Sequence, residues 1–586
     1  MSKAENKNLE PMRHSLAHIM AAAMQKLWPE VKFGIGPTTE EGFYYDVSLG
    51  EQTISPDDLP KIESEMHKII EADVPFEQFV LAINEAIKKE KASNQIYKVE
   101  LLEELKEQGE EEVSYYRSGE FEDLCHGPHI KSSGKVGSFK LYKVAGAYWR
   151  GDETRPMMQR VYGAAFTSQE ALDVFFAHLE KAQENDHRKL GQELDLFTFS
   201  DLVGSGLPLF TPRGTWLREL LGRYAQQLRA EKGFERVWVP HITKTDLYKT
   251  SGHWEKFGDE QFLVSSQETS DELALKPMNC PHHTQIYASK QRSYRDLPVR
   301  YMENTTIYRD EKSGELHGIS RVRSATQDDS HVFCTPEQIE AEVVKFIDAA
   351  KVLYRELQLE LKFRLSFRDE SAAWLGDEEL WQKAQQILEN LAKKEKLDYF
   401  VEEGEAAFYG PKIDFMATDA LGREQQLATV QLDFVQPSRF SLEYIDENST
   451  AQTPVMIHAA LLGSIERFLS VYIEHTGGRF PFWLAPEQVR ILTINDDSLK
   501  YAQKVADVLS ATIIEAPLRH NEIRFSVDDR NESLGKKIRA AEVQKIPVIA
   551  VVGPKDEAAE IVSLRTEGTE EKVKLKELTE WLKAQK

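Results

Sequence analysis

Hydrophobic residues recur along the chain with two different periods, and each period predicts a different element. A helix is predicted over 213–232, where the apolar residues on one face are Trp216, Leu217, Leu220, Leu221, Tyr224 and Leu228. Two strands are predicted at 301–309 and 318–333, joined by a polar segment in which Ser313 and Gly314 are turn residues. The run 458–469 is predicted to be a helix. No apolar run approaches the roughly 20 residues of a membrane span, so no membrane association is expected.

The last hundred residues alternate between strand-like and helix-like patterns. Strands are predicted at 489–494, 512–515 and 547–552, and helices at 499–509 and 534–544. This alternation predicts a small α/β domain with a covered sheet. Pro481 and Pro486 suggest a boundary near 485, and the charged stretch 187–193 suggests an earlier one. Three blocks are therefore expected: 1–190, 191–485 and 486–586.

Composition excludes several classes of protein. The chain has 97 acidic and 73 basic residues and a formal charge of −24, so diffuse positive charge cannot attract nucleic acid, although local basic surfaces can. Three cysteines in 586 residues exclude a disulfide scaffold and suit a reducing compartment. The first ten residues are polar and lack the apolar core of a signal peptide. A cytoplasmic location is therefore expected.

The middle block lacks the glycine-rich loops that usually hold nucleotide phosphates, so any nucleotide must be held by side chains. In an extended strand, residues two apart share a face. Gln327, Asp329 and His331 would then share a face, with Arg321 and Arg323 earlier on the same parity. Such a face can bind an anion at its arginine end and a small polar ligand at the other end. The alternative is a solvated face of an antiparallel sheet.

A thiol and two imidazoles in the same block suggest a metal site. Cys280, His331 and His458 could give a zinc site with three protein ligands and an open position for substrate. Spacing alone is weak support, because the three residues lie far apart in the sequence. Lone histidines are more often structural, and Cys334 is a competing ligand.

Three segments resemble the signature motifs of class II aminoacyl-tRNA synthetases: the helix 213–232 with the strand ending at Pro240, the strand pair carrying Arg309 and Glu311, and Gly463-Ser-Ile-Glu-Arg467. Further matches closely resemble the threonyl-tRNA synthetases, namely Asn279-Cys-Pro-His, Gly318-Ile-Ser-Arg-Val-Arg, Gln327-Asp-Asp-Ser-His331, Phe408-Tyr-Gly-Pro-Lys412 and Met456-Ile-His458. The resemblance runs from about residue 12 to near the C-terminus. It implies an α+β multidomain protein with an antiparallel catalytic core, an α+β editing domain and a C-terminal α/β anticodon-binding domain.

The resemblance also implies roles for residues of the core. Arg309 would grip the α-phosphate of ATP, Glu311 would hold adenine, and Arg321 and Arg467 would take the β- and γ-phosphates, with Mg²⁺ bridging them. Zinc on Cys280, His331 and His458 would bind the amino group and hydroxyl of L-threonine, and Asp329 would accept the hydroxyl proton. The residues expected around amino acid and adenylate are Gln327, Tyr409, Lys412, Gln426 and Gln431, while His253 would assist transfer to the ribose of tRNA(Thr). A homodimer through the first motif is implied as well.

A zinc site that requires a hydroxyl rejects valine but not serine, so the enzyme would need a corrective hydrolysis. His14 and His18 are four apart on a predicted helix, and Asp123-Leu-Cys125-His-Gly-Pro-His129 follows far along the chain. This pairing resembles the family's editing domain, although two helix histidines are often just a core pair. His14, His18, Cys125 and His129 are also a plausible tetrahedral metal set. The resemblance favours metal-free hydrolysis of seryl-tRNA by these four residues and Asp123.

The last block has a basic stretch of Arg519, Arg524, Arg530, Lys536, Lys537, Arg539 and Lys545, predicted to form a basic face. By resemblance, Asn531, Arg539, Asp556 and Arg565 would contact anticodon bases.

The chain departs from the family pattern in three ways. Asp556 stands where the family more often has Glu, and Ala459 where many relatives have Arg. With the first editing histidine at position 14, the small N-terminal domain of bacterial members is expected to be absent, with an effect on tRNA contact that the sequence does not give.

Three other functions compete with threonine–tRNA ligation. They are the prolyl enzyme of the same class, a non-catalytic RNA-binding descendant, and a deacylase with an idle core. The prolyl enzyme would have no use for the zinc site, because proline offers the metal no hydroxyl. The other two would have no need of Arg309, Glu311, Arg321 and Arg467 together.

Overall fold

The computed structural model describes residues 3–152, 154–371, 374–420 and 422–585. Packing divides the chain into two compact units, 1–180 and 181–586. None of the described helices is long and apolar enough to cross a membrane.

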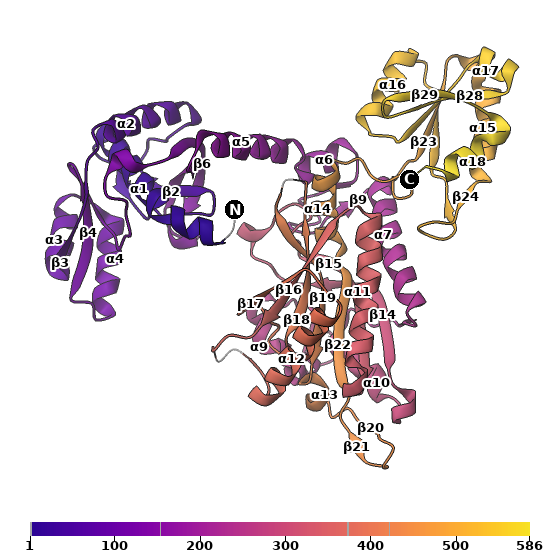
Figure 1. Ribbon diagram of the computed structural model, residues 1–586, viewed down its shortest axis with the longest axis horizontal. Coiled ribbons are helices and arrows are strands. Elements are labelled where there is room, and N and C mark those ends of the chain that lie inside the picture. The colour runs from indigo at the N-terminus through magenta and orange to yellow at the C-terminus, as the bar shows by residue number, and fades with distance from the viewer. Residues whose placement is uncertain (1–2, 153, 372–373, 421, 586) are drawn as a thin grey trace. The chain divides into compact units, whose positions relative to one another are not determined.

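The first unit is built on helix α1 (Lys3–Leu27), which packs beside α2 (Leu59–Glu71) (Figure 1). Both lie against an antiparallel sheet ordered β1 (Lys32–Phe33), β2 (Gly42–Ser48), β7 (Met157–Phe166) and β6 (Ser138–Tyr148). A second antiparallel sheet of β3 (Phe76–Ala82), β4 (Glu112–Ser118) and β5 (Phe121–Leu124) is covered by α3 (Ile83–Ala92) and α4 (Ile96–Glu107). Helix α5 (Gln169–Glu184) follows β7, and Leu172, Phe175 and Phe176 on its first turns pack against residues of β6 and β7.

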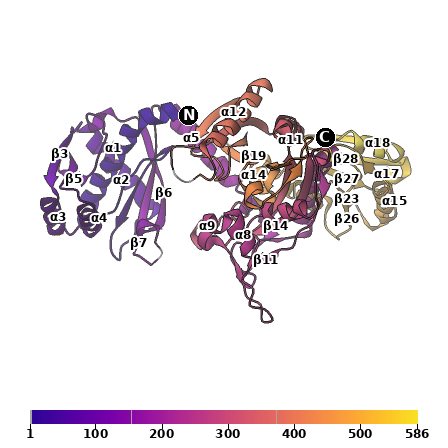
Figure 2. The same cartoon turned by 90° about the horizontal axis from the view of Figure 1, so that it is seen from below.

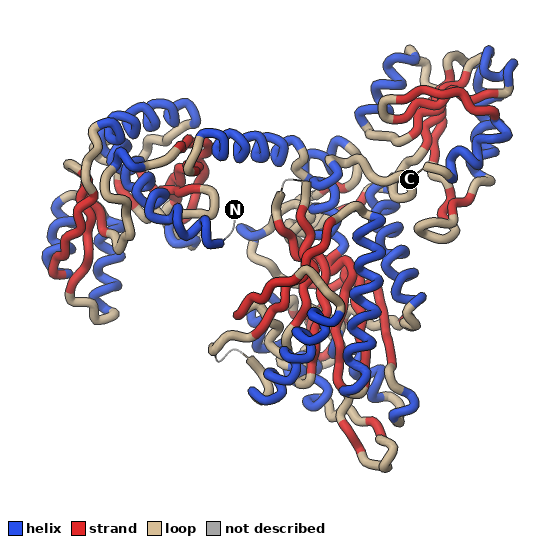
Figure 3. Tube along the Cα trace, viewed as in Figure 1, coloured by secondary structure: helices blue, strands red, loops and turns tan. Residues whose placement is uncertain are grey.

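The second unit contains a long sheet, drawn in red in the middle of Figure 3. Its order is β10 (Glu235–Arg236), β14 (Val299–Tyr308), β15 (Ser324–Cys334), β22 (Val455–Ser464), β19 (Glu424–Asp433), β18 (Lys412–Thr418), β16 (Glu360–Phe367) and β17 (Tyr399–Glu403). Neighbouring strands are antiparallel except at the two edges, where β10 pairs parallel with β14 and β17 with β16.

One face of this sheet carries the main hydrophobic core. The helices packed there include α7 (Pro212–Glu231), α11 (Ile339–Glu356), α12 (Glu378–Lys394) and α14 (Ile465–Thr476). Side chains alternate along a strand, so the opposite face presents the intervening residues. Near that face lie α8 (Asp246–Ser251) and α9 (His253–Phe257), which are labelled in Figure 2. Helix α10 (Cys280–Ala288) packs beside α8 and shares a small core with residues of β14, β15 and β22. Shorter elements are α6 (His187–Glu193), α13 (Gln436–Arg439), β8 (Phe197–Thr198), β9 (Leu209–Phe210), β11 (Ile242–Lys244), β12 (Leu263–Val264), β13 (Leu273–Leu275), β20 (Tyr444–Ile445) and β21 (Ala451–Gln452).

The C-terminal part of this unit has its own mixed sheet, ordered β26 (Phe525–Asp528), β23 (Val489–Thr493), β27 (Val548–Val552), β28 (Ile561–Thr566) and β29 (Thr569–Lys574). Helices α15 (Leu499–Ser510) and α18 (Leu578–Lys583) share a core with one face, and α16 (Leu534–Val543) packs on the other. Helix α17 (Pro554–Ala559) follows β27. The covered sheet is as predicted, but the strand predicted at 512–515 is only β24 (Ile513–Ile514), which pairs with β25 (Asn521–Glu522) outside the sheet.

Two predictions about elements of the core are wrong. Residues 458–469 are not one helix, because β22 continues through His458 and α14 begins only at Ile465. A strand buried on both faces has a continuous apolar run, which cannot be told from a buried helix by pattern. The second strand of the pair begins at Ser324 rather than Gly318, so Arg321 and Arg323 lie in the loop before it.

Candidate functional site

Four central strands bring polar side chains into one row across the sheet. In the strand register, Lys412 pairs with Gln431, Gln431 with His458, and His458 with His331. These four residues stand on the face opposite the main core, since Ile457 and Ala459 on either side of His458 are core residues. The row therefore spans β18, β19, β22 and β15 and forms the floor of a site. Ala459 packs as a small core residue.

The predicted metal ligands meet at one end of this row. One ligand atom each from Cys280, His331 and His458 lies within 4.8 Å of the others, and all three residues are buried. Cys280 is the first residue of α10, and the two histidines come from adjacent strands. Cys334 is not part of this group, because its side chain lies in the core on the other face of β15. The donor set and its closeness fit a zinc ion with an open coordination position.

Burial keeps the ring of His331 neutral and the thiol of Cys280 protonated. The pKa of His331 lies well below its usual value, chiefly because burial penalises the charged ring and then because of His283 and His458. Burial likewise raises the pKa of the Cys280 thiol well above its usual value. A metal ion reverses the penalty on the thiolate, since a coordinating thiol is deprotonated.

Asp329 and Gln327 stand next to this group with unused polar atoms. Asp329 is buried, and its Oδ2 has no hydrogen-bond partner among the described residues. The Oε1 of Gln327 is likewise buried and unpartnered in the described part of the chain. Buried polar atoms without partners are rare and costly, so both atoms are available to a ligand.

A second set of buried residues supports the histidines, and sequence reasoning missed it. His331 Nδ1 lies 2.7 Å from His283 Nδ1, and His458 Nε2 lies 2.8 Å from Asp433 Oδ2. Outer groups of this kind orient metal-binding histidines. Asp433 follows Gln431 by two residues, so both lie on the same face of the strand. This spacing is the sequence signal from which Asp433 could have been predicted.

Next to the row lies an open cavity of about 610 Å³ with a basic lining. Arg309, Arg321 and Arg467 line it, together with Glu311 and Gln327. The pKa of Arg467 is lowered, first by burial and then by repulsion from Arg321, so an anion placed between them would be stabilised. Arg321 also contacts Glu311 at 2.7 Å. The structure thus brings together the four residues predicted to hold a nucleotide.

The other predicted residues of the core lie around the row. Tyr409 donates a hydrogen bond of 2.6 Å to Gln431 Oε1, and its ring stacks on His458. Lys412 pairs with Asp414 at 2.9 Å, and Gln426 donates to the same carboxylate at 2.8 Å. Asp414 was not predicted. Buried His253 has its Nε2 3.5 Å from Cys280 Sγ, which places it beside the predicted metal ligands.

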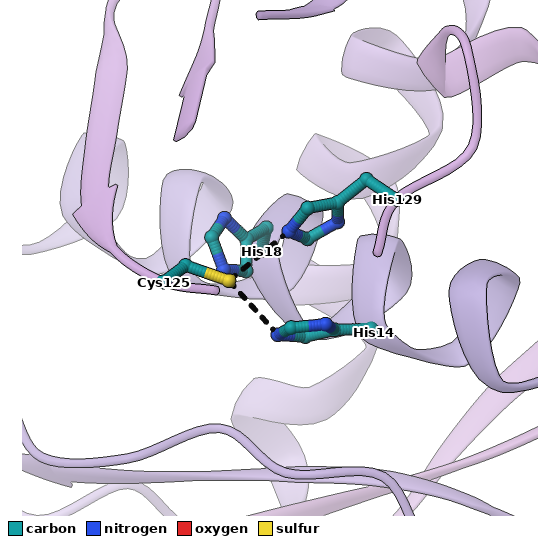
Figure 4. Close-up of side chains that lie close together, drawn as sticks. All are labelled: His14, His18, Cys125 and His129. Carbon is teal, nitrogen blue, oxygen red and sulfur yellow. Dashed lines mark hydrogen bonds between the residues drawn. The ribbon is translucent and has the colours of Figure 1, made fainter. Parts of the chain in front are cut away.

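In the first unit, the histidines of α1 meet the loop after β5. Cys125 Sγ lies 3.2 Å from His14 Nε2 and 3.3 Å from His129 Nε2, and His18 closes the group (Figure 4). Burial lowers the pKa of His18 to about 3, against the attraction of Asp123. Burial and the two neighbouring histidines lower the pKa of His129 to about 2. Three neutral imidazoles and a thiol therefore face one another.

Two further residues complete this group. Lys98 Nζ lies 2.6 Å from Asp123 Oδ1, and the Tyr45 hydroxyl donates to Asp123 Oδ2. All three are buried, and His18 Nε2 lies 3.8 Å from the same carboxylate. Burial alone would raise the pKa of Asp123, but Lys98, His18 and the hydrogen bond from Tyr45 together hold it below its usual value. Sequence reasoning missed Lys98 and Tyr45, because nothing in their local sequence distinguishes them from surface or core residues.

The predicted basic face of the C-terminal part is only partly correct. Arg524 and Lys537 are buried and donate to backbone carbonyls, including those of Trp483 and Thr493. Asn531 and Arg539 are exposed, and Arg565 lies half-buried on β28. Buried Asp556 accepts from Gly553 N and Ser563 Oγ, so both its carboxylate oxygens are occupied.

Three family models match the chain. The tRNA synthetase class II core domain (G, H, P, S and T) matches 262–476, the anticodon binding domain matches 488–585, and the threonyl and alanyl tRNA synthetase second additional domain matches 113–162. The threonine–tRNA ligase of Gloeobacter violaceus is 46% identical over 583 residues, 98% of this chain and 91% of that relative. The chain belongs to the threonine–tRNA ligase family. The relative in Haloquadratum walsbyi is 45% identical over 561 residues, 96% of this chain and 84% of its own length.

A crystal structure of the RNA binding domain of threonyl-tRNA synthetase from Cryptosporidium parvum has a TM-score of 0.64 and 36% identity to this threonine–tRNA ligase. The match covers 68% of this chain and 98% of that one. Membership of the family confirms the predicted fold class and the predicted enzyme, a class II aminoacyl-tRNA synthetase. It sets aside the prolyl alternative.

Proposed function

We propose that this threonine–tRNA ligase joins L-threonine to tRNA(Thr) through a threonyl-adenylate formed in residues 191–485. The observation that carries the proposal is the buried set of Cys280, His331 and His458 beside Asp329, whose Oδ2 has no hydrogen-bond partner among the described residues. In the first step the threonine carboxylate attacks the α-phosphorus of ATP and pyrophosphate leaves. In the second, a ribose hydroxyl of the tRNA attacks the carbonyl carbon and AMP leaves.

The arginine cavity is the proposed nucleotide site. Arg309 would bind the α-phosphate, and Arg321 and Arg467 the β- and γ-phosphates, since guanidinium groups offer planar, permanently charged donors. Glu311 would hold adenine. Mg²⁺ entering with ATP would offset the remaining phosphate charge.

The proposed zinc ligands are Cys280, His331 and His458, and a bound zinc ion would supply a Lewis acid for the amino group and hydroxyl of threonine. Asp329 would accept the hydroxyl proton. Valine, which has no hydroxyl, would leave that buried carboxylate unpartnered, a cost of about 1–3 kcal/mol or more. The residues proposed to surround amino acid and adenylate are Gln327, Tyr409, Lys412, Gln426 and Gln431, with His253 proposed to assist transfer to the ribose.

Serine carries both groups and would be accepted too often, because one methyl group is worth only about 1–3 kcal/mol. We propose that residues 1–190 hydrolyse seryl-tRNA(Thr) without a metal, using His14, His18, Asp123, Cys125 and His129. Water would attack the ester carbonyl, and serine and free tRNA would leave. Lys98 keeps Asp123 ionised in this site.

Residues 486–586 are proposed to bind the anticodon through Asn531, Arg539 and Arg565. Asp556 is the least available of the predicted contacts, because its carboxylate oxygens are already occupied. A homodimer is proposed along the first motif, where Trp238 is 74% exposed; Ile242 and Leu263, which follow the motif in the sequence, are 47% and 69% exposed. Sedimentation of the wild type should give twice the chain mass, and Trp238→Arg should shift it to the monomer, whereas Val80→Arg in the first unit should not.

ATP–pyrophosphate exchange with threonine, serine, valine and proline tests the proposal. We expect threonine to be best, serine measurable, and valine and proline near background. Enzyme stripped of metal should lose exchange with threonine and regain it with zinc. Exchange with none of the four amino acids would favour an RNA-binding protein or a deacylase with an idle core instead.

A further inference from the structure

Ser15 lies between the two histidines of α1 and is fully buried. Its hydroxyl makes three short contacts. Oγ lies 2.8 Å from the carbonyl oxygen of Pro11, 3.1 Å from the amide nitrogen of Ile130, and 3.0 Å from Nδ1 of His129. Ser15 thus touches His129 of the proposed editing site.

These contacts determine where the protons are. A hydroxyl has one donor hydrogen and two acceptor lone pairs. The amide of Ile130 can only donate to Oγ, and the carbonyl of Pro11 can only accept from it. The hydroxyl hydrogen is thus used on Pro11, since two oxygens 2.8 Å apart with no hydrogen between them would repel each other. The second lone pair must then accept a hydrogen bond from His129, so Nδ1 of His129 carries a hydrogen.

Only one ring nitrogen of His129 can carry a hydrogen. Burial, His18 and His14 lower its pKa to about 2, so the ring is neutral at any working pH. With the hydrogen on Nδ1, Nε2 presents a bare lone pair, and this atom lies 3.3 Å from Cys125 Sγ. Figure 4 shows the rings of His129 and His14 both reaching toward that sulfur.

The thiol cannot satisfy both rings. Burial raises the pKa of Cys125 to about 11, so it keeps its single hydrogen. His14 has a hydrogen bond with the backbone of Pro128, and its Nε2 lies 3.2 Å from the same sulfur. One hydrogen therefore faces two ring nitrogens, and one lone pair remains for a water molecule.

We propose that Ser15 is a positioning residue that fixes His129 in the Nδ1–H form and so turns the Nε2 lone pair toward the seryl ester. The inference rests on the editing activity proposed above. In the hydrolysis, the water oxygen bonds to the ester carbonyl carbon while Nε2 accepts one water proton. The bond to the ribose oxygen then breaks, and that oxygen takes the proton. Without Ser15, the ring of His129 is free to carry its hydrogen on Nε2. In that form Nε2 has no lone pair with which to accept a proton from water.

The experiment compares Ser15→Ala with Ser133→Ala in the full chain. Ser133 is a matched control, because it is also fully buried, donates to the carbonyl of Ile69 at 2.8 Å and accepts from Val74 N at 2.9 Å, but bonds to no histidine. Both variants lose one hydroxyl with two backbone hydrogen bonds. We measure single-turnover hydrolysis of seryl-tRNA(Thr), threonine charging, and the ring ¹⁵N signals of His129, assigned with His129→Gln.

Ser15→Ala should slow hydrolysis by about tenfold or more, since a positioned base contributes ~10²–10⁴-fold. Threonine charging should not change. In the wild type, Nδ1 of His129 should be protonated and Nε2 bare, and Ser15→Ala should mix the two forms. Equal losses in both serine variants, or a wild-type ring protonated on Nε2, would overturn the inference. A wild type that does not hydrolyse seryl-tRNA would instead contradict the proposed editing, and the ring signals would still test the role of Ser15.

Discussion

At Asp329, burial and the neighbouring histidine rings shift the pKa of the carboxylate in opposite directions. Burial raises its pKa, while His283 and His458 oppose that rise. One of its oxygens has no partner in the described part of the chain. A group left in this state costs folding free energy, and the cost is recovered only when a ligand donates a hydrogen bond to it.

Asp329→Asn tests this idea at the scale of one residue. A hydrogen bond to a charged group contributes about 1.5–3 kcal/mol and a neutral one about 0.5–1.5, so the difference of about 1.4 kcal/mol is tenfold in affinity. We expect kcat/KM for threonine in pyrophosphate exchange to fall about tenfold, and the preference for threonine over valine to shrink. The KM for ATP is the internal control. A comparable rise in the KM for ATP would mean that the substitution had disturbed the sheet instead.

At the scale of elements, the turn between β17 and β18 places Tyr409 beside the row across the sheet and leads into Lys412, the first residue of β18. Its backbone passes very close to β19. A Cβ on Gly410 would stand 1.7 Å from the carbonyl oxygen of Leu432, and backbone cannot give way as a flexible side chain can. The hydrogen bond between Tyr409 and Gln431 depends on this close approach.

Gly410→Ala should therefore move the turn away from β19 and break that hydrogen bond. We expect a rise in the KM for threonine of about tenfold, with the KM for ATP changed less. Gly535→Ala is the control, because a Cβ there meets nothing within 4 Å. If the two variants behaved alike, the turn would have no special role in holding the amino acid.

The elements also show what could and could not be predicted from the sequence. Helix α7 was predicted to within one residue at each end, since its apolar spacing is regular and Gly233 follows it. The strand through His458 was not, because a doubly buried strand has no alternation to recognise. The prediction of a basic face was wrong for Arg524 and Lys537. Both look like surface cations in the sequence, but in the structure they donate hydrogen bonds to buried backbone carbonyls.

The candidate sites divide in the same way. Residues in local motifs were found, such as His14 with His18 and Gln327 with Asp329. Lys98, Tyr45, His283 and Asp433 were not predicted, although each touches a predicted residue. The fold brings these residues to their partners, and no local spacing in the sequence indicates such a contact.

At the scale of the whole molecule, the first unit should be sensitive to acid. The pKa of His18 is about 3 and that of His129 about 2 in the folded chain, both below the value of about 6.5 in an unfolded one. As pH falls below 6.5, the unfolded chain binds protons that the folded one refuses, so stability is lost by about 1.4 kcal/mol per pH unit for each histidine.

Calorimetry of the full chain should therefore show the unfolding of residues 1–180 at a clearly lower temperature at pH 5 than at pH 7.5. His18→Gln should reduce that pH dependence, whatever it does to stability at pH 7.5. His178→Gln, at an exposed position on α5, should leave it unchanged. A melting temperature independent of pH over this range would contradict the assignment of neutral, buried histidines.

The division into two compact units implies that the two proposed activities can be separated. His14 and His18 belong to the first unit, and the row of Lys412, Gln431, His458 and His331 to the second. His14→Ala combined with His18→Ala removes two of the three rings beside Cys125. We expect threonine charging within about twofold of wild type and at least a tenfold slower clearance of seryl-tRNA(Thr), because the rings that surround the attacking water are gone. His67→Ala, on α2 and away from Cys125, is the matched histidine control. If seryl-tRNA were cleared at the wild-type rate, editing would have to be sought in the second unit, and if threonine charging fell as well, the two units would be coupled.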